Sequence, residues 1–249
     1  MELNNRIFTV FSDEADRTVI DEIHIGLGYT MVTLRDGRSG ICATLCDPTR
    51  VYSVNTDPND YEGRSALQLL RHIHGQSQHM SRVMAIALVN ALNQPFANSL
   101  PEVPSDWHGD LGLNQGASIA MIGHFPPVAE RFEEKGFTLK VLDLGERIGD
   151  GNSFYPWALE KADALVITAA SIVHNELEEI LGKFKGKRIP IVLTGPTTIL
   201  HPDVYEGLPI THLAGSVVID RKDMMKAVRN GRGSLDVHHQ AKKVYLNLG

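Results

Sequence analysis

The sequence predicts an α/β protein, with a small α+β domain followed by a Rossmann-like, doubly wound parallel sheet. Three observations lead to this fold class. Alternating apolar segments joined by an Asp-Gly turn occupy the first third of the chain. Short apolar strands alternate with single helices after residue 116. A stretch rich in Asn, Pro, Ser, Asp and Gly separates these two patterns.

The first domain is expected over residues 1–95. Apolar alternation predicts its strands, at residues 18–27, 29–35 and 40–45. Asp36 and Gly37 predict a hairpin between the last two strands, because both residues tolerate a positive φ. Apolar residues spaced three and four apart predict two helices, at residues 65–74 and 81–93. Ser81 is the expected N-cap of the second helix, and Pro95 is expected to stop it.

Residues 96–115 are expected to form a linker, and residues 116–249 the second domain. Its predicted strands are nearly all apolar, as a sheet covered on both faces requires, at residues 118–122, 138–142, 164–168, 189–193 and 210–214. Its predicted helices alternate with them, at residues 127–135, 156–161, 174–181, 202–205 and 222–230.

The composition excludes several classes of protein. Lys and Arg total 24 against 30 Asp and Glu, a net charge of −6, which argues against a nucleic-acid or anionic-membrane binder. No apolar run is long enough to span a bilayer and no basic-then-apolar leader begins the chain, so a soluble, cytoplasmic protein is expected. Cys42 and Cys46 lie in one predicted strand, too far apart for a disulfide, and are expected to be buried apolar residues.

The 11 histidines raise the question of a metal site. They do not answer it, because no His-Glu-x-x-His motif, Cys-x-x-Cys pair or facial triad occurs. The absence of a Gly-x-Ser-x-Gly elbow likewise gives little support to a serine hydrolase.

Residues that leave the carboxyl ends of the parallel strands are the expected ligand-binding residues, because ligands bind there in open α/β sheets. They are Gly123, His124, Phe125, Asp143, Thr168, Ser171, Gly195, Pro196, Thr197, Thr198 and Gly215. In the first domain, Gly28, Tyr29 and Thr30 join two strands and could project from a tight connection, or form a plain turn.

The loop from Gly195 to Thr198 suits a phosphate, a carboxylate or another oxyanion, since glycine allows close backbone approach and the threonines offer hydroxyls. A Gly-Pro turn with threonines capping a short helix explains the same residues. Ser171 could equally be the N-cap of the helix that follows it.

Gly123 stands where a dinucleotide fold carries its phosphate turn, and Asp143 follows 20 residues later, where an acidic residue would reach a ribose. The glycine-rich fingerprint itself is missing, so an NAD-type cofactor is not favoured. His124 at this position could be a general base or a metal ligand, or serve a structural hydrogen bond.

Several motifs together resemble one known family, the uncharacterised prokaryotic proteins named "putative heavy-metal chelation". They are residues 122–127 (Ile-Gly-His-Phe-Pro-Pro), 162–168 (Ala-Asp-Ala-Leu-Val-Ile-Thr), 195–198 (Gly-Pro-Thr-Thr), 213–215 (Leu-Ala-Gly), 26–30 (Gly-Leu-Gly-Tyr-Thr) and 91–93 (Ala-Leu-Asn). The resemblance implies a domain similar to the enolase N-terminal domain fused to a Rossmann-like domain, with shared residues facing a cleft between the two.

The chain departs from the family pattern in two loops. After the third parallel strand it has Thr168-Ala169-Ala170-Ser171, with His174 and Glu176 further along, where the family favours Thr-Gly-Thr/Ser-Thr followed by Asn and Thr. The second loop has Gly195-Pro196-Thr197-Thr198-Ile199 in place of Gly-Pro-Ser-Thr-Pro, a conservative change.

Three hypotheses follow. The first is a protein, enzymatic or not, whose interdomain cleft binds a heavy-metal ion or metal chelate, with His124 and His174 as candidate metal ligands. The second is an enzyme that binds a nucleotide or phosphorylated metabolite on Thr197 and Thr198, with Asp143 near a ribose. The third is a non-catalytic interaction module, with a homodimer formed through a sheet edge. The cofactor and the reaction are not specified by the sequence.

Overall fold

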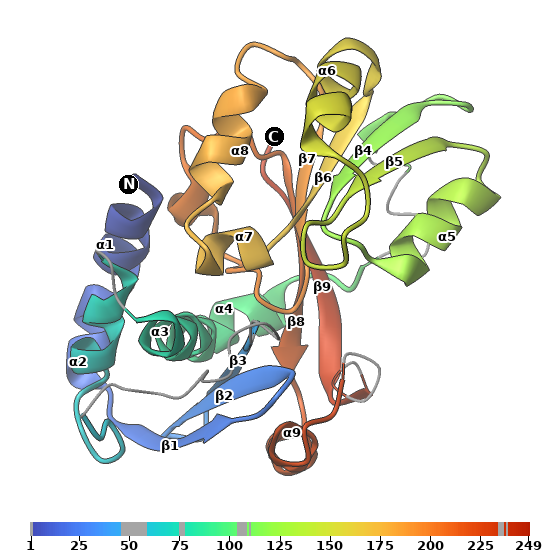
Figure 1. The fold of residues 1–249 in the computed structure, drawn as a ribbon. Helices are drawn as coiled ribbons and strands as arrows, with labels where there is room; N and C mark the ends of the chain where they lie inside the picture. Colours follow the sequence, from blue (N-terminus) through green and yellow to red (C-terminus); the bar gives the residue numbers. More distant parts are fainter. Residues whose placement is uncertain are drawn as a thin grey trace.

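The computed structural model describes residues 2–45, 59–74, 78–103, 109, 111–233, 237 and 239–249. Its strands form two sheets, as Figure 1 shows. The order is β1-β2-β3 in an antiparallel three-stranded sheet and β5-β4-β6-β7-β8-β9 in a six-stranded, mostly parallel sheet. The predicted mixed α/β class, with a small antiparallel sheet and a larger parallel one, is confirmed.

The small sheet follows the predicted pattern. Its strands are β1 (Ile20–Ile25), β2 (Tyr29–Leu34) and β3 (Ser39–Ala43). Gly37, with φ of +92°, closes the hairpin between β2 and β3. Every residue of β2 is buried, because helix α3 (His79–Leu92) packs on one face of the sheet and helix α9 (Arg221–Arg229), from the other end of the chain, packs on the other (Figure 1).

The first two helices of the chain differ from the prediction. No helix was predicted before residue 18, yet α1 (Glu2–Arg17) occupies that segment and buries Leu3, Ile7 and Phe11. The predicted helix at 65–74 is a short α2 (Ala66–Leu70) that continues as the 3-10 helix η1 (Arg71–Ile73).

The N-cap predicted for the next helix was wrong, and the helix that contains Pro95 was not predicted. Helix α3 (His79–Leu92) begins at an N-cap of Gln78, while Ser81 is a buried residue within its first turn. Helix α3 ends at Leu92, before Pro95, as predicted. Pro95 lies in the first turn of a further helix, α4 (Gln94–Ser99), where its missing N–H costs no helical hydrogen bond.

The parallel strands match the prediction closely. They are β4 (Ser118–Ile122), β5 (Thr138–Leu142), β6 (Ala164–Thr168), β7 (Ile191–Thr194) and β8 (His212–Val218). A sixth strand, β9 (Ala241–Asn247), was not predicted and pairs antiparallel with β8.

Helices cover both faces of the large sheet (Figure 1). They are α5 (Pro126–Glu134) on one face and α6 (Gly151–Lys161), α7 (Ala170–Val173) and α8 (Leu177–Lys183) on the other, with η3 (Pro202–Tyr205) after β7. Pro156 was expected to begin a helix but lies inside α6. The predicted helix at 174–181 is instead α7, a break at His174 to Glu176, and α8.

Residues of both predicted domains contribute to one hydrophobic core. A single cluster contains Leu88 of α3, Ile172 of α7 and Leu193 of β7. The helical layer of the N-terminal part therefore shares one core with the large sheet and the helices that cover it.

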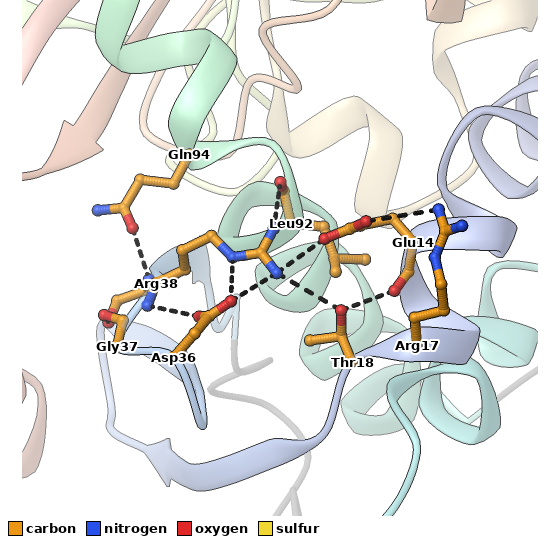
Figure 2. Close-up of polar contacts among 9 residues, drawn as sticks. Glu14, Arg17, Thr18, Asp36, Gly37, Arg38, Leu92 and Gln94 are labelled. Carbon is orange, nitrogen blue, oxygen red and sulfur yellow. Dashed lines mark hydrogen bonds and ion pairs between the residues drawn. The ribbon is translucent and has the colours of Figure 1, made fainter.

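A polar network around Arg38 fastens the β2–β3 hairpin to its surroundings, as Figure 2 shows. Arg38 forms ion pairs with Asp36 at 2.7 Å and with Glu14 of α1 at 2.8 Å, and donates to the carbonyl of Leu92 at 3.3 Å. Gln94 accepts from the N–H of Ser39 and donates to the carbonyl of Val218 in β8. The network thus joins the small sheet to α1, to the end of α3 and to the large sheet.

Within the part of the chain that the structure describes, no helix is both long enough and apolar enough to cross a membrane.

Candidate functional site

The order of the parallel strands places the candidate site. Numbered along the chain, β5-β4-β6-β7-β8 is a 2-1-3-4-5 order, which reverses direction between β4 and β6. Gly123 follows β4 at this point with φ of +88°, and a Cβ there would lie 2.6 Å from the Cβ of Thr168. Glycine is therefore required for the two strand-end loops to touch.

His124, the next residue, is held by two carboxylates. Its backbone N–H donates to Asp143 Oδ2 at 2.8 Å, and its Nδ1 lies 2.7 Å from Glu146 Oε2. The other oxygen of Asp143 accepts from the N–H of Glu146 at 2.9 Å. Asp143 thus holds the backbones of His124 and Glu146 at once, and both of these contacts are structural.

The His124–Glu146 pair can do two kinds of chemistry. A carboxylate at Nδ1 favours the proton on that atom, so Nε2 carries the lone pair. A lone pair oriented in this way can ligate a metal or accept a proton. The side chain of His124 is 27% exposed and that of Glu146 is 58% exposed, so solvent reaches the pair.

Glu146 was not among the predicted site residues. It lies in a turn after β5, closed by the bridge between Asp143 and Ile148 and containing Arg147 with φ of +58°. An acidic residue three positions after Asp143 was the available signal, but its pairing with His124 depends on the β4–β5 register.

Phe125 and Gly195 lie near each other across the strand ends. A Cβ on Gly195, whose φ is +125°, would be 3.7 Å from the Phe125 ring. The loops after β4 and β7 therefore approach over the end of β6, and Pro196 follows in the second of these loops.

The hydroxyls of the strand-end loops are engaged within the protein. Thr197 Oγ1 accepts from the N–H of Ala43 at 3.0 Å, and Thr198 Oγ1 donates to the carbonyl of Ala214 at 2.9 Å. Both threonines are buried. Thr197 therefore joins the loop after β7 to strand β3 of the small sheet.

Thr168 and Ser171 make a similar local pair. Thr168 Oγ1 accepts from the N–H of Ala170 at 3.2 Å, and Ser171 Oγ donates to the carbonyl of Thr168 at 2.7 Å. Ser171 is not an N-cap, because Ala169 occupies that position and Ser171 lies inside α7.

The predicted residues of the small sheet lie deeper. A Cβ on Gly28 would be 2.8 Å from the carbonyl of Arg232, so this turn packs against the segment after α9. Tyr29 is buried, and burial raises the pKa of its hydroxyl, with a smaller contribution from Cys42. Thr30 Oγ1 lies 3.1 Å from Thr44 Oγ1. Gly215 of β8 packs against the side chain of Leu200.

Cys42 is a free thiol and fully buried, and burial raises its pKa to about 12. It was predicted to be a buried apolar residue, and the structure agrees. Cys46 lies outside the described residues.

His174 is brought together with His79 rather than with His124. The rings of His79 and His174 lie 5.8 Å apart between centroids. Among the contacts of the described residues, none joins His124 to His174. No group of three or more His, Cys, Asp or Glu side chains suited to a metal ion occurs in that part of the chain.

A cavity of about 10 Å³ lies between the two sheets, lined by Ser39, Gly40, Asn90, Asn93, Ala97, Leu200, Ser216, Val217 and Val218. It has room for about one water molecule.

Two family models match the chain, and both carry the description "Putative heavy-metal chelation". One matches residues 9–93, and the other matches residues 108–247, more than half of the chain. The chain belongs to this heavy-metal chelation family.

Three proteins are similar to this chain over most of its length. An uncharacterized protein of Methanocaldococcus jannaschii is 24% identical over 229 residues, which cover 88% of this chain and 86% of that protein. A crystal structure of a DUF364-family protein of unknown function from Pyrococcus horikoshii has a TM-score of 0.80 at 22% identity, covering 99% of this chain and 100% of that one. A second, from Desulfitobacterium hafniense, has a TM-score of 0.74 at 17% identity and covers 98% of each chain. These structures share the fold of the heavy-metal chelation family member described here.

Proposed function

We propose that this protein binds a transition-metal ion as a complex with an organic ligand, at the reversal point of the parallel sheet. His124 Nε2 is the proposed protein ligand. The observation that carries the proposal is the 2.7 Å contact between His124 Nδ1 and Glu146 Oε2. Metal-ligating histidines usually give their second nitrogen to such a partner, which fixes the tautomer and raises the basicity of the ligand. The family description points to the same chemistry.

The donor set favours a metal complex over a bare ion. Imidazole suits zinc, copper and nickel, whereas soft metals prefer thiolates, and Cys42 is buried away from solvent. Because the described residues contain no group of three metal-binding side chains, the remaining positions on the metal belong to its organic ligand. The cavity between the sheets holds about one water molecule, so the complex would lie at the exposed strand ends.

The nucleotide alternative has less support from the contacts. Both oxygens of Asp143 accept backbone N–H groups, so a ribose hydroxyl would have to displace them. The N–H groups of Gly195 and Thr198 donate to carbonyls of Ala214 and Gly195, respectively. A phosphate in this loop would compete with these hydrogen bonds.

Equilibrium dialysis of the protein against Zn²⁺ and Ni²⁺, each with and without citrate, tests the proposal. His124→Gln should abolish one equivalent of binding. Glu146→Gln should weaken that equivalent by about tenfold to a hundredfold, the usual effect of removing a partner of a metal-binding histidine. Glu130→Gln, which changes an exposed carboxylate on α5, is the control. Unchanged binding in His124→Gln would rule the site out.

A further inference from the structure

Two imidazoles from distant parts of the sequence lie against each other away from His124. His79 is the first residue of α3, and His174 is the C-cap of α7. Their ring centroids are 5.8 Å apart and their planes are 19° from parallel. His174 is exposed and His79 is half-buried, so a solute can reach the pair.

Arg82 holds the backbone that carries His174. It lies one turn after His79 on α3 and donates to the carbonyls of Ile172 and Val173, the two residues that precede His174. Arg82 is 3% exposed, so these hydrogen bonds are shielded from water. The two histidines are therefore positioned by the rigid contact of α3 with α7.

A second contact selects the form of His79. Its Nε2 lies 2.8 Å from the carbonyl oxygen of Thr44. A carbonyl can only accept, so Nε2 carries the proton and Nδ1 keeps its lone pair. A ring nitrogen with a free lone pair is the atom that binds a metal.

We infer that His79 and His174 form a second metal site, which takes a transition-metal ion that carries its own anionic ligands and has two open positions. Two imidazoles supply part of a coordination sphere. The positive charge of Arg82 and the N-terminus of α3 disfavour a bare dication and favour carboxylates on the metal. Glu176, two residues beyond His174, is the acidic group nearest in sequence. The site shares no residue with the one proposed at His124 and does not depend on it.

Isothermal titration of the untagged, full chain with the Ni²⁺–nitrilotriacetate complex tests the inference, because this complex leaves two coordination positions open. His79→Gln and His174→Gln should each raise the Kd of one site by about tenfold or more. The Kd of the double variant should be no higher than that of the single variant that binds more weakly, since either change removes the paired coordination. His124→Gln should leave this site unchanged while removing the other, so each of the two proposals can fail separately.

A Kd in both single variants that is unchanged from that of the unaltered protein, or losses that simply add in the double variant, would overturn the inference. Circular dichroism and thermal midpoints check that the variants fold. A measurement on the unaltered protein gives an independent answer, because bound Ni²⁺ broadens the NMR signals of nearby imidazoles. Broadening of both His79 and His174 supports the site, and broadening confined to other histidines contradicts it.

Discussion

The guanidinium of Arg82 donates two hydrogen bonds to the carbonyl of Ile172, from Nε at 3.2 Å and from Nη2 at 2.7 Å. It also donates to the carbonyls of Val173 and Ile73 and to Asn4 Oδ1. No carboxylate occurs among these contacts. Burial lowers the pKa of Arg82 to about 10, with Cys42 opposing, and the side chain still carries its charge at pH 7. One buried cation therefore joins α3 to α1, η1 and α7 through neutral acceptors.

Replacing Arg82 by Met should destabilise the protein by about 3 kcal/mol or more, because each buried acceptor left without a donor costs roughly 1–3 kcal/mol. Urea unfolding followed by circular dichroism measures the loss. Arg131→Met on the exposed face of α5 is the control and should change the free energy of unfolding by about 0.5 kcal/mol or less. A loss below about 1 kcal/mol for Arg82→Met would contradict the structural role given to its hydrogen bonds.

Thr197→Val should cost about 1–3 kcal/mol, because valine keeps the shape but leaves the partly buried N–H of Ala43 without its acceptor. The matched control is Thr138→Val, an exposed residue of β5, which should be nearly neutral. Hydrogen exchange of the Ala43 amide provides a local readout. If that amide exchanges no faster in Thr197→Val than in the unaltered protein, the hydrogen bond is not what protects it.

Gly123→Ala and Gly136→Ala separate two costs of adding a Cβ. Both glycines have positive φ, +88° and +77°, and an alanine in this conformation costs about 1–2 kcal/mol. Apart from its chain neighbours, no atom of the described residues lies within 4 Å of a Cβ on Gly136, whereas a Cβ on Gly123 would meet Thr168 at 2.6 Å. Gly123→Ala should therefore lose about 1–3 kcal/mol more in thermal or urea unfolding. Equal losses of unfolding free energy in the two variants would show that the loop after β4 accommodates the added Cβ without strain.

The stability of the protein should fall on acidification partly through His201. The centroid of its ring lies 5.7 Å from the ring centroid of Phe11 and 5.0 Å from that of Phe96. Its Nδ1 has no hydrogen-bond partner among the described residues. Burial lowers its pKa in the folded state below the ordinary value of about 6.5, with Asp203 opposing. The unfolded chain then binds more protons, so the free energy of unfolding decreases as pH falls through about 6.5 toward the folded pKa.

His201→Phe keeps the aromatic contacts and removes the proton-binding group. The slope of unfolding free energy against pH between 7 and 5 should therefore be shallower in this variant. His239→Phe, which changes an exposed histidine, should leave the slope unchanged. Identical slopes in His201→Phe and the unaltered protein would exclude His201 as a source of acid sensitivity.

Local patterns were sufficient where each strand or turn is specified by its own residues. The predicted bounds of β4, β5 and β6 agree with the structure, because a strand buried on both faces must be apolar throughout. The Asp36-Gly37 turn was also found, since the backbone there needs a positive φ. Helix α1 was missed although Leu3, Ile7, Phe11 and Ala15 recur every four residues, a spacing that was available in the sequence. Strand β9 was missed because polar residues interrupt its apolar run, and its pairing with β8 completes it.

The sequence by itself determined the fold class, the apolar parallel strands and the family resemblance, because these depend on composition and local periodicity. The tertiary structure alone decided which side chains meet. His124 receives Glu146 through the register of β4 with β5, and His174 meets His79 because Arg82 anchors α7 to α3. Contacts of this kind join residues that no local pattern relates, so their chemistry becomes visible when the sheet and the helices pack together.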